Sequence, residues 1–390
     1  MRREWAILCF LAGAACPLSA ATPMTVAQLR QLLNASRGKS DGKVARRLSE
    51  IELTERVSAA QFAQWQAEFS GGHTREALTE LADASAFLDL PTTEIPSTPA
   101  PSFEEQRQIL SRAVSYAAKA LSKLPNFYAT RETTHFEDTL PRETFEPIAT
   151  TSSGRGGSRS MGTAGMTVTG TDYQPLHKTG TFSEKVRYQD GFEVNGSHGH
   201  KSWDEQGTGL TTNGEFGPIL FVVLRDSVKG QLVWNHWEQG SNGSVAVFAY
   251  YVPQANSHYM VAVPRTRGFD QLLPAYRGEI AIDPANGTIL RLTVISEMAP
   301  PYQTVKAAIL VEYAPVAIGD RTYICPVKGV ALSKMPAGGA NDGSQVQTRL
   351  NEVVFKDYHL FRGDAHILTG SVSGDDTGSA ATAVASGTPR

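Results

Sequence analysis

The spacing of apolar residues changes near Phe127, and this change decides which elements the chain can form. Before it, apolar residues recur at three- and four-residue spacing, as Val26, Leu29 and Leu33 do, which predicts amphipathic helices. After it, alternating residues and short apolar runs rich in β-branched and aromatic side chains predict strands. We therefore predict an α+β protein, with a small N-terminal helical bundle and a large curled antiparallel β-sheet, or half-barrel, that holds an internal helix.

Composition and turn signals suggest the domain boundaries. The apolar pattern of residues 22–90 predicts the bundle. It consists of three or four short helices, and Thr25 and Ser58 are placed to cap two of them. Residues 91–102 are rich in proline and threonine and predict an extended linker. Residues 103–362 predict a helix followed by the curled sheet, and residues 363–390 form a low-complexity tail that we expect to be disordered.

The predicted strands are separated by turn clusters and should pair in chain order as a meander. They are residues 128–136, 181–194, 232–238, 245–252, 257–263, 278–282, 288–295, 305–313, 322–333 and 346–361. About ten strands in one open sheet must curl, which gives the sheet a concave face. A short apolar helix is predicted over residues 217–226, where Pro218 suits the first helical position.

Residues 1–21 predict a signal peptide. Arg2 and Arg3 precede an apolar run that is too short to span a membrane, and small residues around Ala20 suit cleavage there or after Ala21. We expect a periplasmic or secreted protein with no transmembrane span in the mature chain. Lipoprotein processing at Cys16, with acyl anchoring, is the competing interpretation.

Cleavage would leave Cys325 as the only thiol, so no intramolecular disulfide is expected. Cys325 lies in a strand-like run and is interpreted as a buried hydrophobic residue. The net charge is −3, with acids and bases mixed along the chain. This balance argues against nucleic acid as a partner.

Few residues suggest chemistry. His198, His200, Asp204 and Glu205 form the most metal-like cluster, but they lie in a polar loop without a second ligand pair at the usual spacing. The Gly/Ser-rich residues 150–170 lack the ending of a phosphate-binding loop, and we interpret them as a surface loop. No hydrolase elbow, zinc-protease motif or Cys-x-x-Cys pair occurs, so we expect no catalytic residues, metal or cofactor.

Apolar residues on both sides of one strand favour a ligand site. In Val245–Val252 both faces are apolar, which requires cover on both sides or an apolar cavity on one. The 217–226 helix is apolar nearly all round and should sit inside the concave face. Strict alternation would put Trp234 and His236 on one face of their strand and Trp237 on the other. The predicted ligand-binding residues are Ile219, Leu220, Val223, Trp234, Phe248 and Tyr250.

Residues 104–362 resemble the half-barrel fold of outer-membrane lipoprotein carriers and related lipoprotein-sorting proteins. The resemblance rests on export, a helix before a meander, an internal apolar helix, and the hairpin 278–291, in which Asp283-Pro284 and Gly287 precede a strand containing Arg291. It implies acyl-chain binding in the concave face. The whole chain also resembles a group of uncharacterised secreted acidobacterial proteins, and that likeness implies no function.

Three functions follow as hypotheses. The first is a non-enzymatic exported protein that binds a lipid or other apolar ligand in the concave face. The second is a structural or interaction module of the cell envelope, whose bundle contacts a protein partner through Phe62, Trp65 and Phe69. The third is a metal-dependent hydrolase that uses His198, His200 and Asp204.

Overall fold

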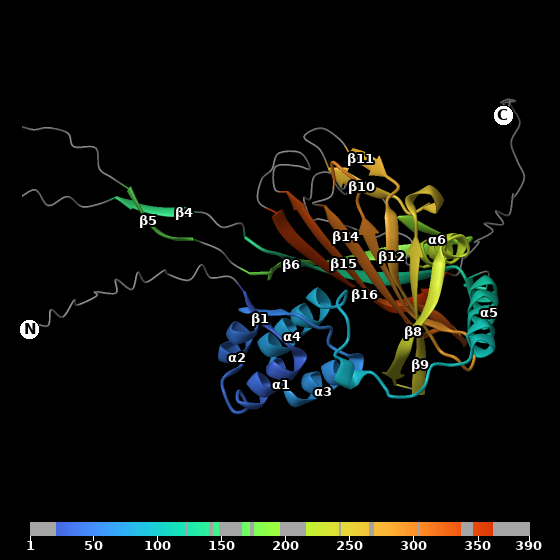
Figure 1. Ribbon diagram of the computed structural model, residues 1–390, viewed down its shortest axis with the longest axis horizontal. Helices are drawn as coiled ribbons and strands as arrows, with labels where there is room; N and C mark the ends of the chain where they lie inside the picture. The colour runs from blue at the N-terminus through green and yellow to red at the C-terminus, as the bar shows by residue number, and fades with distance from the viewer. Residues whose placement is uncertain are drawn as a thin grey trace, which may run out of the picture.

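The computed structural model describes residues 21–361, except for residues 122, 140–142, 148–165, 172–174, 196–215, 242, 265–268, 303–304 and 337–345. The described chain is α+β, as predicted, and contains a large antiparallel sheet with helices on both sides (Figure 1). The signal peptide, Cys16, the arginines of the Gly/Ser-rich loop and the C-terminal tail lie outside the described residues. In the part that is described, no helix is both long and apolar enough to cross a membrane.

The N-terminal bundle has its own apolar core. Its helices are α1 (Val26–Asn34), α2 (Asp41–Leu48), α3 (Ala59–Glu68) and α4 (Gly72–Ala84). The Thr25 side chain caps α1 in a capping box with Gln28, and Ser58 caps α3, as the sequence predicts. A short parallel pair, β1 (Thr22–Met24) with β2 (Ile51–Leu53), was not predicted. Leucine side chains from α1, α2 and α4 pack around Trp65 in the core.

The main sheet has ten strands in the order β7-β6-β3-β16-β15-β14-β13-β12-β9-β8. Their bounds are β3 (Phe127–Glu137), β6 (His177–Gln189), β7 (Phe192–Asn195), β8 (Gln231–Gly240), β9 (Gly243–Val252), β12 (Ala275–Ile282), β13 (Ile289–Glu297), β14 (Lys306–Ile318), β15 (Arg321–Pro336) and β16 (Val346–Leu360). Strands β12 to β16 form the predicted meander. β7 and β8 are the edges of the described sheet, so the sheet is open.

Three features differ from the predicted strands. The predicted strand 181–194 is a hairpin, because Asp190 and Gly191 adopt positive φ of 54° and 88° and turn the chain between β6 and β7. Residues 257–263 do not join the main sheet; β10 (Val261–Pro264) pairs instead with β11 (Phe269–Leu272). The last residues of the predicted Gly/Ser-rich loop form a strand, β5 (Met166–Thr171), which pairs with β4 (Glu143–Pro147), a strand that precedes the loop.

The two faces of the sheet have different cover. One, here called the α6 face, carries Phe248 and Ile280 and packs against α5 (Phe103–Leu121) and α6 (Pro218–Ser227). The other, the bundle face, packs against the segment after α4: Ala86 and Phe87 cluster with apolar residues of β14, β15 and β16. Figure 1 shows the blue bundle helices grouped on one side, away from α5 and α6.

Two contacts fix the parts beside the sheet. Asp226, at the end of α6, is 1% exposed and accepts hydrogen bonds from the His258 backbone N–H at 2.8 Å and the Tyr276 hydroxyl at 2.9 Å. These bonds tie α6 to β12 and to the segment before β10. The linker runs along the edge strand, where the indole Nε1 of Trp237 donates to the Pro99 carbonyl at 2.9 Å.

Candidate functional site

The residues predicted to bind a ligand lie in the main apolar core. Ile219, Leu220 and Val223 of α6 are buried in the same cluster as Phe248 and Tyr250, and Trp234 packs against that cluster. Side chains from α6 and the sheet thus fill the interface between them. The Tyr250 hydroxyl reaches across the sheet and donates to the Thr293 carbonyl at 2.6 Å. The structure brings the six predicted residues together as packed core, and Tyr250 is the one of them that also lines the cavity described below.

The predicted alternation along β8 is wrong at one residue. A β-bulge at Asn235 separates the pair Trp234–Phe248 from the pair His236–Val247. The extra residue places Trp234 and Trp237 on the same face, with ring centroids 4.8 Å apart, and turns His236 to the bundle face. His236 Nε2 lies 3.0 Å from Glu238 Oε1 there.

The aromatic residues proposed for partner contact face inward. Trp65 is 2% exposed, and Phe62 and Phe69 pack against the bundle core. Lys328 of β15 lies 5.8 Å from the centre of the Phe62 ring. These three side chains therefore hold the bundle together and hold it on the sheet, so they are not a free docking surface.

The metal hypothesis is not supported by the described residues. His198, His200, Asp204 and Glu205 lie outside them. Within the described ranges, no group of three or more His, Cys, Asp or Glu side chains is placed to hold a metal ion. Cys325 is a buried free thiol, as predicted, and burial raises its pKa to about 12.

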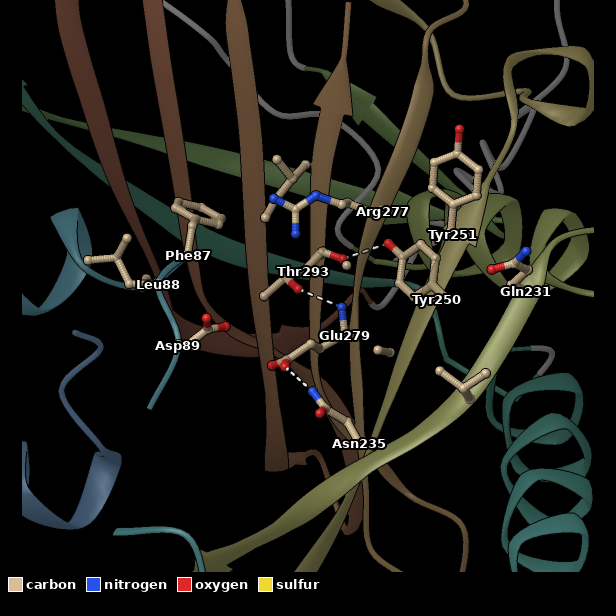
Figure 2. Close-up of a pocket in the computed structure, with 15 residues that line it drawn as sticks. Phe87, Leu88, Asp89, Gln231, Asn235, Tyr250, Tyr251, Arg277, Glu279 and Thr293 are labelled. Carbon is tan, nitrogen blue, oxygen red and sulfur yellow. Dashed lines mark hydrogen bonds between the residues drawn. The ribbon is translucent and has the colours of Figure 1, made fainter. Parts of the chain in front are cut away.

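The cavity lies on the bundle face, between the segment after α4 and strands β8, β9, β12 and β13 (Figure 2). Its volume is about 250 Å³. One wall is Ala86–Asp89, and the opposite wall is formed by the strands. Sequence reasoning missed this site because the wall and the strands are distant in the chain and meet only when the bundle docks.

Gly278 gives the cavity its floor. A side chain at this position would begin 1.9 Å from the Thr293 carbonyl oxygen and 2.8 Å from the Tyr250 hydroxyl, so only glycine fits. The neighbouring Glu279 backbone N–H donates to the Thr293 hydroxyl at 2.8 Å, as Figure 2 shows. A side chain at Gly278 would point to the α6 face, as its partner Tyr250 does, so the glycine lets the Tyr250 hydroxyl reach the Thr293 carbonyl across this part of β12.

A buried cluster of charges borders this floor. Glu238 accepts hydrogen bonds from Arg56 of the bundle at 2.6 Å and from Arg291 at 2.8 Å to each of its oxygens. Burial alone would raise the pKa of Glu238, but the hydrogen bonds from Arg291 and His236 and the charge of Arg56 outweigh it and hold that pKa far below its usual value. Glu279 lies 3.5 Å from Arg291 and 3.7 Å from Arg56, so the two acids and two arginines balance.

The rest of the lining mixes polar and apolar groups. Asn235, which the bulge turns inward, donates to Glu279 at 2.8 Å. Arg277 enters from β12 and is paired with Glu297 at 3.2 Å, while Asp89 lines the cavity from the bundle side (Figure 2). Hydrogen-bonding groups stand beside apolar patches such as Val233. Such a lining suits recognition of a bound molecule; its described residues contain no nucleophile paired with a base.

Family models, curated proteins and solved structures were compared with this chain, and none matches it. The resemblance to lipoprotein carriers therefore stays a prediction. Function has to be argued from the cavity and its chemistry.

Proposed function

We propose that this chain is an exported, non-enzymatic binding protein that holds a small amphipathic molecule between its helical bundle and its sheet. The observation that carries the proposal is the cavity of about 250 Å³ on the bundle face, lined by both polar and apolar side chains. Small-molecule sites generally measure about 300–1,000 Å³. The ligand is therefore small, or only part of it enters.

The lining favours a ligand without large net charge. The acids Glu238 and Glu279 are balanced by Arg56 and Arg291, and Arg277 is balanced by Glu297. The remaining polar groups include the Asp89 carboxylate, the Asn235 amide and the Gln231 side chain, which suit hydroxyl or amide groups of a ligand. Phe87 and Val233 offer apolar contact beside them. A hydroxyl-bearing head with a short apolar portion meets both requirements.

This site differs from the acyl-chain site that the resemblance implies. The space between α6 and the sheet is occupied by the core, whereas the cavity on the other face has polar walls. A single-chain amphiphile fits the proposal, and a two-chain lipid does not.

Ala249→Phe tests the site, because Ala249 lines the cavity and the added ring would fill it. Native mass spectrometry and thermal-shift measurements against short-chain glycosides and single-chain amphiphiles should show binding to the parent chain and loss of binding in this variant. Ala317→Phe makes the same change at an exposed position of β14 and should leave binding intact. Failure of the parent chain to bind any of these compounds, or equal binding by both variants, would overturn the proposal.

A further inference from the structure

One face of α4 carries a row of acids that lies across the sheet. Glu76, Glu80 and Asp83 follow one another at four- and three-residue spacing, which places them on one side of a helix. Glu76 pairs with Lys178 of β6 at 3.1 Å, and Asp83 pairs with Lys328 of β15 at 2.6 Å. Because these two contacts fix both ends of the row, Glu80 lies between them over the central strands, where α4 contacts β16.

Carboxylates outnumber bases at the Asp83 end of this row. Lys328 also pairs with Glu352 at 3.2 Å, and Glu312 stands directly opposite Lys328 in the neighbouring strand. Asp83 is 3% exposed, and its Oδ2 has no hydrogen-bond partner among the described residues. Arg291 of β13 stands on the other side of Glu312, but this arginine is already shared by Glu238 and Glu279. Among the described residues of this interface, the five carboxylates therefore share only Lys328, Arg291 and Arg56, so a bound proton stabilises the docked state.

Burial raises the pKa of both Asp83 and Glu80. It raises the pKa of Asp83, helped by Glu352 and Glu312 and opposed by Lys328. Burial, with Glu76 as a like-charged neighbour, raises the pKa of Glu80 to about 8. The other charged contact behaves differently, since the pKa of Glu238 is held low and its pairing with Arg56 persists over the same pH range.

The acid row of α4 is close in the chain to the wall of the cavity that the bundle supplies. Ala86–Asp89, the wall supplied by the bundle, begins three residues after Asp83, at the end of α4. The Arg56 backbone N–H donates to the Asp89 carbonyl at 2.8 Å, so the Asp89 end of this wall is tied to the Arg56–Glu238 contact. Movement of α4 away from the sheet would therefore displace the Ala86 end of the wall while its Asp89 end stays with Arg56.

We propose that the acid row of α4 is a proton-dependent latch: the bundle closes on the sheet when Glu80 and Asp83 are protonated, and α4 lifts away as they ionise. The role of this movement in ligand capture and release rests on the proposed function; the movement itself does not. A carboxyl group whose pKa is higher in the docked state holds its proton more tightly there. Docking is thus favoured in acid and weakens as the pH rises through the raised value, which for Glu80 is about 8.

Spin labels at Arg47→Cys in α2 and Lys306→Cys in β14 would report the separation of bundle and sheet, since both positions are exposed. Cys9→Ser and Cys16→Ser remove the other reactive thiols, and Cys325 is buried. Pulsed dipolar spectroscopy should give one short distance at about pH 5.5 and a growing longer population towards about pH 8.5, with up to about tenfold change in the ratio per pH unit for each proton released.

Glu80→Gln imitates the protonated acid without breaking a described ion pair, and should keep the short distance at high pH. Glu80→Gln/Asp83→Asn should do so more completely. Glu50→Gln, an exposed acid of the bundle, is the matched control and should behave as the parent chain. An unchanged distance distribution in the parent chain over this range, or an identical response in Glu80→Gln, would overturn the latch.

Ligand binding is measured separately over the same pH range. A latch that opens while no panel compound binds would contradict the proposed function and leave the latch standing. Ligand binding with a distance that never changes would contradict the latch and leave the proposed function standing.

Discussion

Arg56 of the bundle donates a hydrogen bond of 2.6 Å to Glu238 of the edge strand β8, although 182 residues separate them in the chain. Their side chains are 8% and 12% exposed. At a second contact the donor belongs to the sheet, because Lys328 of β15 lies 2.6 Å from Asp83 of the bundle. The two contacts lie at different strands and run in opposite directions, so together they define one orientation of the bundle: a turned arrangement would bring Arg56 against Lys328.

Arg56→Met should weaken docking strongly. The change leaves the Glu238 carboxylate with one fewer partner in a buried site, and breaking such a pair costs about 3–5 kcal/mol. Urea unfolding followed by tryptophan fluorescence and circular dichroism would measure the loss. Arg37→Met removes the exposed pair with Glu68, where 62% of the arginine side chain is accessible, and should lower stability far less than Arg56→Met does, because water screens an exposed pair. Equal effects of the two changes would contradict the buried role of Arg56.

Gly278→Ala should destabilise the sheet. The new methyl group would lie 1.9 Å from the Thr293 carbonyl oxygen, and the strands must shift to admit it. Overpacking of this kind costs about 1–3 kcal/mol, and denaturant unfolding would measure it. Gly42→Ala is the control: nothing lies within 4 Å of the added carbon, and alanine favours the α2 helix, so stability should hold or rise.

Asp226→Ala should loosen α6. The change removes the acceptor of the buried Tyr276 hydroxyl, which costs about 1–3 kcal/mol when left unpaired, and the acceptor of the backbone N–H of the exposed His258. We expect a lower melting temperature and faster hydrogen exchange in α6. The same substitution at Asp320, in an exposed turn, should leave both unchanged. Normal exchange in α6 of Asp226→Ala would show that packing alone holds the helix.

The Cys325 thiol should resist alkylation in the folded protein. Burial raises its pKa to about 12, so the reactive thiolate is scarce at pH values near 8. Peptide mass spectrometry after iodoacetamide treatment should find Cys325 unmodified in native conditions and modified in denaturant. Because the folded state favours the protonated thiol, this contribution to stability disappears as pH rises from about 9 towards 12.

Local signals predicted local structure well. Thr25 caps α1, Pro218 occupies the first turn of α6, and the Asp283–Gly287 segment turns the chain between β12 and β13. Each depends on residues within a few positions of one another. The α+β class was likewise visible, because it follows from the period of the apolar pattern.

The cavity could not be predicted in the same way. It requires the bulge at Asn235, which shifts every later side chain of β8 to the other face, and the docking of a wall from residues 86–89. Neither follows from periodicity, because both depend on which distant segments meet. The apolar residues on both faces of strand 245–252 correctly indicated that both sides of the sheet are covered. Helices α5 and α6 cover one face, and the bundle helps to cover the other.

The pairing of β3 with β16 affects how the protein is made. His135 of β3 lies opposite Asn351 of β16, so the first and last strands of the main sheet along the chain are neighbours inside it. A chain that is synthesised or exported from its N-terminus can pair β3 with β6 and β6 with β7 early, but these three strands cannot join the rest of the sheet until β16 has emerged. Such long-range pairing slows folding and leaves strands uncovered meanwhile. Truncation before β16 should thus separate the three strands β7, β6 and β3 from the strands β15 to β8, because β16 is the strand that joins them.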